Sequence, residues 1–404
     1  MARLTSDSCP TLTKDLVLEC YPKVSETIQQ PWNAADVYLI NHLNDEIKPT
    51  LDASSSVLII NDFYGALTCS LSTTLASELP KMNLSVLSDS FCSQQAIKKN
   101  LSTNQLELCR IQSTHEANFT SLTKDDVVLI QMPKSFDVLH YWLSLLSQQI
   151  ENSENSPKVL LAGMSKHIPI KWLNWLEQHS ARYQQYPQVK KSRLIEIQLP
   201  KAWPKLAIWK GYEYLGNQLN ALPSVFSRDH LDIGSRFLLE NLHHHQLQNI
   251  SGTLIDLGCG NGLLSVSIAN QYTAIDQVIG CDDSNAAVCS AEKNFDNWQE
   301  SHPQRNNVRS RFQHTNVLES VAEKADWIVC NPPFHSGNRI TTDIAQSMIK
   351  QSKGQLKENG KLLLIANRHL PYQGSLKKHF KKTRQIAANK KFVLYLCESG
   401  TSGV

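Results

Sequence analysis

Several features are scarce in this 404-residue sequence, and each absence excludes a class of protein. No apolar run approaches the ~20 residues that a membrane-spanning helix needs, and the first twenty residues lack the apolar stretch of a signal peptide. The ten cysteines form no Cys-x-x-Cys pair, which favours reduced thiols over disulfides or a zinc cluster. A net charge of only +3 does not by itself indicate a nucleic-acid partner. We therefore expect a cytoplasmic protein that does not enter a membrane.

The length and the apolar fraction of 41% are typical of a globular protein with two domains. In the second half, short apolar runs alternate with helical patterns, which predicts a parallel sheet covered by helices. The first half repeats this order: "DDVVLIQMPKS" (125–135) is similar to "ADWIVCNPPFH" (325–335), and Asp89-Ser90 matches Asp283-Ser284. Five such matches in the same order predict a duplicated domain.

The two copies differ in the residues that carry chemistry. In the first copy the glycine turn reads "NDFYGA", where Phe63 and Tyr64 replace Gly258 and Cys259. The counterpart of Asn-Pro-Pro-Phe is Gln-Met-Pro-Lys (131–134). We predict an α/β protein with two tandem Rossmann-like domains. They are a degenerate, non-catalytic domain over residues 1–200 and a catalytic domain over residues 201–404.

A glycine-rich turn, "DLGCGNG", follows an apolar strand and opens a helical pattern. Gly258, Gly260 and Gly262 permit a tight turn and the close approach of a ligand. Asp256 disfavours a pyrophosphate beside it but suits an amino group or a sulfonium. Asp282, at the end of the next strand, is placed to accept hydrogen bonds from ribose hydroxyls. A ribose with a cationic tail indicates S-adenosylmethionine as the cofactor.

The apolar strand "ADWIVC" runs directly into Asn331-Pro332-Pro333-Phe334. Prolines cannot continue a central strand, so this strand stops with one amide and one aromatic ring at its end. An exocyclic amine that is conjugated with a base is a poor nucleophile until its lone pair leaves conjugation. The Asn331 side-chain carbonyl and the Pro332 backbone carbonyl can each accept one N–H, which aims the lone pair at a methyl group. The prolines keep the carbonyl in place, and Phe334 offers a face for stacking, worth ~1–3 kcal/mol.

Three further residues have two interpretations each. Asn316 follows a short strand and either contacts the adenine or is a plain loop residue. Asp232 and Ser235 either reach the methionine end of the cofactor or cap a helix. The three adjacent histidines 243–245 point in different directions on a helix end, so we expect no metal site.

Three segments together, "DLGCGNG", "CNPPFH" and "VFSRDHLDIGSRFLL", resemble the ribosomal RNA guanine-N2 methyltransferases with tandem domains. "PWNAADVYLINHL", "LLIANRHLPY" and "NKKFVLYL" are similar to the large-subunit methyltransferase G family among them. The resemblance implies that both Rossmann-like domains are of the class I methyltransferase type, and that the chain methylates the N2 amine of one 23S rRNA guanine with S-adenosylmethionine. It implies that the residues Asn331 to Phe334 hold the base, that Asp256, Gly258 and Asp282 hold the cofactor, and that the first copy helps to bind RNA.

Asn-Pro-Pro-Phe does not by itself choose the amine. Guanine N2 of 16S rRNA, adenine N6, cytosine N4 and a protein glutamine amide stay open, as does a non-catalytic RNA-binding assembly factor. The segment 375–391 carries seven Lys and Arg residues and no acidic residue, which favours RNA over a protein substrate. A solvated helix face is the alternative interpretation of that segment. We expect a monomer whose partner is ribosomal RNA, with 23S favoured over 16S.

Overall fold

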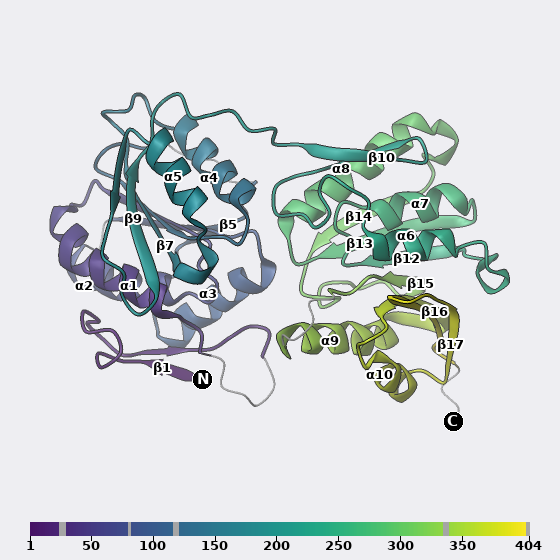
Figure 1. The fold of residues 1–404 in the computed structure, drawn as a ribbon. Helices are drawn as coiled ribbons and strands as arrows, with labels where there is room; N and C mark the ends of the chain where they lie inside the picture. Colours follow the sequence, from purple (N-terminus) through teal and green to yellow (C-terminus); the bar gives the residue numbers. More distant parts are fainter. Residues whose placement is uncertain (24–29, 80–81, 116–120, 334–338, 401–404) are drawn as a thin grey trace. The chain divides into compact units, whose positions relative to one another are not determined.

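The computed structural model describes residues 1–23, 30–79, 82–115, 121–333 and 339–400. They form two units, Met1–Ile208 and Trp209–Val404, whereas the sequence places the boundary at residue 200. Each unit contains a seven-stranded sheet with helices against it (Figure 1). The predicted α/β class with Rossmann-like units is therefore confirmed.

In the first unit the strands lie in the order β5-β4-β3-β6-β7-β9-β8. All neighbouring strands pair in parallel except β9, which is antiparallel to β7 and β8. A short β1–β2 ladder stands apart from this sheet. The elements are β1 (Ala2–Leu4), β2 (Leu16–Leu18), α1 (Ala34–His42), β3 (Ser56–Ile60), α2 (Ala66–Glu78), β4 (Asn83–Leu87), α3 (Phe91–Thr103), β5 (Arg110–Gln112), β6 (Val127–Gln131), α4 (Phe136–Gln148), β7 (Lys158–Met164), α5 (Ile170–His179), β8 (Arg182–Gln185) and β9 (Ser192–Gln198).

The second unit has the same strand order, β14-β13-β12-β15-β16-β18-β17, again with one strand, β18, antiparallel to its neighbours. A hairpin of β10 and β11 precedes its sheet. The elements are β10 (Lys210–Tyr214), β11 (Asn217–Ala221), α6 (Ile233–Glu240), β12 (Gly252–Leu257), α7 (Leu263–Gln271), β13 (Ile275–Asp282), α8 (Asn285–Ser301), β14 (Arg309–His314), β15 (Ala325–Cys330), α9 (Arg339–Gln355), β16 (Leu356–Asn367), α10 (Tyr372–His379), β17 (Lys382–Ala388) and β18 (Phe392–Glu398).

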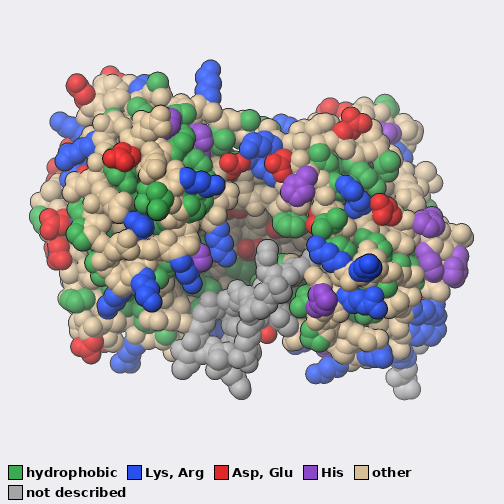
Figure 2. Space-filling model, viewed as in Figure 1, with side chains coloured by type: hydrophobic (Ala, Val, Ile, Leu, Met, Phe, Trp, Pro, Cys, Tyr) green, Lys and Arg blue, Asp and Glu red, His purple; other side chains and the backbone are tan. Residues whose placement is uncertain are grey.

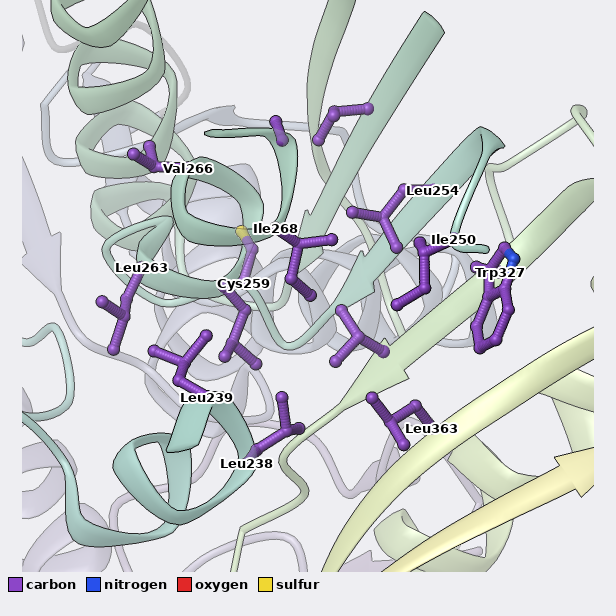
Figure 3. Packing of buried hydrophobic residues seen from close by; sticks show 14 of the residues in the cluster. Leu238, Leu239, Ile250, Leu254, Cys259, Leu263, Val266, Ile268, Trp327 and Leu363 are labelled. Atoms are coloured by element: carbon purple, nitrogen blue, oxygen red, sulfur yellow. The ribbon is translucent and has the colours of Figure 1, made fainter. Parts of the chain in front are cut away.

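Both faces of the second sheet are buried, which explains why its central strands are apolar throughout rather than alternating. Successive side chains of a strand point to opposite faces. Leu254 of β12 therefore packs in a core with α6, α7 and α8, while the next residue, Ile255, packs with α9 and α10. Figure 3 shows the first of these cores, in which residues of α6, α7, β12, β15 and β16 share one apolar interior.

Several helices begin at a side chain that satisfies their first free N–H groups. The Ser90 Oγ accepts from the N–H of Ser93 at the start of α3, and the Ser284 Oγ accepts from Ala287 at the start of α8. Gly262 begins α7 in the left-handed region, with φ of 79°. The strand-to-helix turns at this edge are thus specified locally by short polar residues and by glycine.

The turn after the central strand shows which residues of the two units correspond to each other. Asn61 and Gly258 each follow the last residue of that strand, donate their N–H to the neighbouring strand, and have φ of 70° and 78°. Phe63 therefore takes the place of Gly260. The sequence match that set Phe63 against Gly258 is wrong by two residues, because it did not use the positive φ values that only the backbone reveals.

A buried asparagine links the same segments in each unit. In the second unit, the Asn294 Nδ2 on α8 donates to the carbonyls of Asn220 and Asn261 at 2.7 and 2.8 Å, and its Oδ1 accepts from the N–H of Asn220 at 3.0 Å. Asn100 on α3 makes the same kinds of bond to Glu19 and to the turn after β3. A shared set of buried bonds of this kind supports the duplication.

We predict that Asn294→Ala destabilises the second unit. The change leaves buried backbone groups of Asn220 and Asn261 without their partner, so the free energy of unfolding should fall by about 2–4 kcal/mol. Urea unfolding measures this loss. Asn297→Ala, at an exposed position of the same helix, is the matched control and should cost less than about 0.5 kcal/mol. Equal losses in the two variants would contradict the linking role.

Candidate active site

Three neighbouring strands of the second unit end in one row. Leu257 of β12 pairs with Cys281 of β13 on one side and with Cys330 of β15 on the other. The residues that come next in the chain, Gly258, Asp282 and Asn331, therefore lie side by side at the carboxyl ends of these strands. Ligands of open parallel sheets bind at this carboxyl edge, so the predicted cofactor turn, ribose acid and amide converge where a ligand is expected.

The glycine turn leaves room for a ligand beside its backbone. Gly258, Gly260 and Gly262 all have positive φ, of 78°, 55° and 79°. A Cβ on Gly260 would meet no described atom within 4 Å, and one on Gly258 would meet only the Met348 methyl group at 3.4 Å. A Cβ on Gly262, by contrast, would press on the backbone of Ala291 at 3.0 Å. The first two glycines thus form a cradle, and the third permits close packing of α7 on α8.

Asp256 is buried, with 1% of its surface exposed, and it links β12 to α7. Its Oδ2 accepts from the Ser265 N–H at 2.9 Å and from the Ser265 hydroxyl at 2.7 Å. Its Oδ1 has no hydrogen-bond donor among the described residues. Burial raises the pKa of Asp256 to about 6, and the bonds from Ser265 oppose that rise. The predicted contact of Asp256 with the cofactor stays a prediction.

Asp282 lies at the end of β13 and accepts hydrogen bonds on both oxygens. Its Oδ2 accepts from the Gly260 N–H at 3.1 Å, and its Oδ1 accepts from the Ser284 N–H at 3.0 Å. These bonds hold the carboxylate against the glycine turn. Asp282 is only partly buried, and a carboxylate at this position suits hydrogen bonds from the two hydroxyls of a ribose.

The Asn331 amide meets the start of α6. Its Nδ2 donates to the Asp232 Oδ2 at 2.9 Å and to the Ser235 Oγ at 2.8 Å. Asp232 also caps α6, since the same Oδ2 accepts from the Ser235 N–H at 2.7 Å. The structure thus supports the capping interpretation of Asp232 and adds a contact that the sequence did not predict. The Asn331 Oδ1 is buried and accepts no bond within the described part of the chain.

The remaining predicted residues have different surroundings. Asn316 follows β14 and is buried, with 7% exposed, and its Nδ2 donates to the Glu319 Oε1 at 2.8 Å. Its adenine contact stays a prediction. Pro332 is buried and Pro333 is exposed. Phe334 lies outside the described residues, so its stacking role also stays a prediction.

Ser265 and Asn294 are supporting residues that sequence reasoning did not identify as parts of the site. A signal for Ser265 existed: Thr68 stands at the same place in the first unit, and its N–H and hydroxyl bind Asp62. A hydroxyl three residues into the helix after the turn therefore recurs in both copies. Without the register of the turn, that recurrence is not visible in the sequence.

Two negative findings concern the described residues alone. Among them, no three His, Cys, Asp or Glu side chains come together in a way that could hold a metal ion. A search of the same residues for helices long and apolar enough to cross a membrane found none.

Comparison with known proteins gives the family. Residues 7–201 match the RLMG N-terminal domain, and residues 216–396 match the Methyltransferase small domain. The ribosomal RNA large subunit methyltransferase G of Vibrio vulnificus is 36% identical over 394 residues, covering 94% of this chain and 96% of that protein. The protein of the same name from Psychromonas ingrahamii is 33% identical, covering 94% and 95%. This chain belongs to the ribosomal RNA large subunit methyltransferase G family.

A solved structure has the same fold. It is a T. thermophilus 16S rRNA N2 G1207 methyltransferase in complex with AdoMet and guanosine. The two chains are 21% identical, with a TM-score of 0.68 that covers 85% of this chain and 88% of the other. Together with the family, this likeness confirms the predicted S-adenosylmethionine-dependent methyltransferase class.

We predict that Asp256 makes the second unit less stable as pH rises. The ordinary pKa of the carboxyl is 3.8 and burial raises it to about 6, so between these values the folded state binds more protons than the unfolded state. Linkage then requires stability to fall with rising pH in that window. Asp256→Asn removes the titration while its side-chain oxygen still accepts from Ser265.

The measurement is urea unfolding of both proteins near pH 4.5 and near pH 7. The free energy of unfolding of the Asn variant minus that of the wild type should be larger at the higher pH. A difference that stays constant across this range would show that Asp256 does not titrate there.

Proposed function

We propose that this chain transfers a methyl group from S-adenosylmethionine to the exocyclic N2 amine of a guanine in 23S rRNA, in the cytoplasm. The observation that carries the proposal is the Asn331 amide, whose oxygen has no partner among the described residues and lies at the same sheet edge as the glycine turn and Asp282. The choice of 23S follows the large-subunit name of the relatives. Guanine N2 of 16S rRNA, the substrate named for the T. thermophilus structure, is the second candidate.

The residues at this edge fit the cofactor. The cofactor would lie against the backbone of Gly258 and Gly260, where there is room for it, and Asp282 would accept hydrogen bonds from its ribose hydroxyls. S-adenosylmethionine, when bound, supplies a methyl group on a cationic sulfur. The buried Asp256 Oδ1 accepts no hydrogen bond from the described residues, and a positively charged group of the cofactor would satisfy it.

The chain's part in the reaction is to prepare the amine. The Asn331 Oδ1 and the Pro332 carbonyl each accept one N–H, so the nitrogen lone pair is turned away from the base. The new N–C bond forms as the S–C bond breaks with its electron pair on sulfur, and the amine then releases a proton. No side chain has to remove a proton first, because the attacking nitrogen becomes acidic only once it carries the extra methyl group.

The first unit does not take part in this chemistry. At the matching edge it has Asn61 and Phe63 where the second unit has Gly258 and Gly260, so two side chains stand where the second unit has bare backbone. Its strand β4 is followed by Ser88, not by an acidic residue, at the place of Asp282. Loss of both features supports a non-catalytic role for residues 1–200, and the RNA-binding role that the family resemblance implies for them is part of this proposal.

A basic surface of the second unit supports an RNA partner. We call it the α10–β17 surface: an open hollow of about 460 Å³ that is lined by Lys377, Phe380, Lys381, Lys382, Thr383 and Arg384. Figure 2 shows Lys and Arg side chains gathered over the part of the molecule that Figure 1 draws as α10 and β17. Lys382 and Arg384 share one acidic residue, Glu398, at 3.5 Å each. Positive charge therefore exceeds negative charge in and around the hollow.

Methyl transfer to purified, unmodified 23S and 16S rRNA tests the function. With tritiated S-adenosylmethionine, we expect label in 23S rRNA alone, recovered as N2-methylguanosine. Asn331→Ala should lose at least about 100-fold in rate, because the amine is no longer aimed, while the cofactor still binds in calorimetry. Asn297→Ala is the matched control. Label in 16S rRNA alone would change the substrate, and wild-type activity of Asn331→Ala would contradict the aiming role.

The α10–β17 surface gives a separate prediction. Lys377 and Lys378 are exposed on α10, and changing both to Glu should weaken rRNA binding and lower the salt slope of log K by about 2. Filter binding at several salt concentrations measures that slope. Lys293 and Lys350 to Glu, on α8 and α9, change the net charge equally and should leave the slope nearer to wild type. An unchanged slope in the first variant would mean that the surface is merely solvated.

A further inference from the structure

The orientation of the Asn331 amide follows from its partners. Asp232 is a carboxylate that only accepts hydrogen bonds, so the amide NH₂ and not the amide oxygen must face it. The distances from the Asn331 Nδ2 are 2.9 Å to the Asp232 Oδ2 and 2.8 Å to the Ser235 Oγ. With both N–H groups used, the oxygen is directed away from α6. Rotating the amide by half a turn would bring its oxygen against the carboxylate and lose the bond to Asp232, although the Ser235 hydroxyl could donate to either end of the amide.

The same carboxylate oxygen also begins the helix. Asp232 Oδ2 accepts from the Ser235 N–H at 2.7 Å as well as from the Asn331 amide. The start of α6 and the end of β15 are thus joined at one atom, although the residues are 99 positions apart in the sequence. A side chain so held is pre-organised, since its rotamer is set before any substrate binds.

The first unit has the same arrangement, made of different residues. Gln131, at the end of β6, occupies the place of Asn331, and its Nε2 donates to Asp36 in the first turn of α1. The Gln131 Oε1, like the Asn331 Oδ1, is buried without a partner among the described residues. The amide is longer by one methylene, and the carboxylate is three residues into the helix instead of at its cap. The contact between an amide NH₂ and a carboxylate at the start of a helix is therefore present in both units, although the residues differ.

We propose that Asp232 and Ser235 are positioning residues for methyl transfer: they hold the Asn331 amide so that its oxygen, and not its nitrogen, meets the amine of the target base. The inference rests on the proposed function, in which that oxygen accepts one N–H of the amine. A reversed amide would set N–H donors against the N–H donors of the substrate. This role is neither of the two that the sequence suggested for these residues, which were a contact with the methionine end of the cofactor and a helix cap alone.

Kinetics of three variants test the proposal. Asp232→Ala removes the acceptor of the amide and the helix cap, and kcat should fall on the order of 30-fold. Asp232→Asn supplies a carbonyl that can accept both bonds and is an equally good cap, so it should recover most of that loss. Ser235→Ala keeps the cap and loses one bond, with an intermediate fall. In all three, the KM for rRNA and the Kd for S-adenosylmethionine should stay within about threefold of wild type.

A matched control separates positioning from stability. Ser90→Ala removes a helix cap of the first unit, where the Ser90 Oγ accepts from the N–H of Ser93. It should lower the Tm about as much as Asp232→Ala does but leave kcat near wild type. If kcat falls equally in Ser90→Ala and Asp232→Ala, the effect is loss of stability and the positioning role is overturned.

A second measurement does not depend on activity. In protein labelled with ¹⁵N-asparagine, the Asn331 side-chain NH₂ signals, assigned by their absence in Asn331→Ala, should exchange slowly with water. Exchange should quicken in Asp232→Ala and Ser235→Ala and slow again in Asp232→Asn. Fast exchange in the wild type overturns the proposal even if methyl transfer is confirmed. Slow exchange that depends on Asp232, in a protein that methylates neither rRNA, keeps the held amide and rejects the proposed function.

Discussion

The parallel pairing of β12 with β13 and β15 is the interaction on which the site depends. It sets Leu257, Cys281 and Cys330 in one row, so the three chain segments that follow must leave the sheet at the same edge. None of the polar groups at that edge could be brought together by local structure alone. Because the row is buried on both faces, a slip of one residue would turn every side chain to the wrong layer. Apolar burial of the strands therefore holds the polar site in register.

Much of this arrangement could be predicted from the sequence. Glycines after an apolar strand, an acidic residue after the next one, and Asn-Pro-Pro after a third are each local signals. The sheet edge at which Gly258, Asp282 and Asn331 meet follows from the rule for parallel strands. The duplicated plan is also visible in the sequence, since apolar strands and the Asp-Ser pairs before α3 and α8 recur in the same order. Such features are predictable because each depends on a short segment and on one general rule.

The contacts between distant segments could not be predicted in this way. The sequence predicted Asp256 as a ligand for a cation, and the structure adds what the sequence did not indicate: one of its oxygens binds Ser265 and its carboxylate is buried. Asp232 had two interpretations as a cap or a ligand, and the structure shows it capping α6 and binding Asn331 with one oxygen. A short polar residue before a helix has the same sequence signature in either role. Only the three-dimensional placement of α6 against the end of β15 reveals the second contact.

The degenerate unit shows what the catalytic sheet edge requires. In the first unit, the Met132 N–H donates to the Ala162 carbonyl at 2.8 Å, so β6 continues its ladder with β7 past the amide of Gln131. Pro332 occupies the same place in the second unit and has no N–H to donate. Strand β15 consequently ends at Cys330, one residue earlier than its counterpart, and Asn331 lies beyond the ladder. Both units have an amide side chain bound to the start of a helix, but only in the second unit does the strand end before that amide. Pro332 is thus the residue that ends the ladder one position earlier in the second unit, while the contact between the amide and the helix start is kept in both.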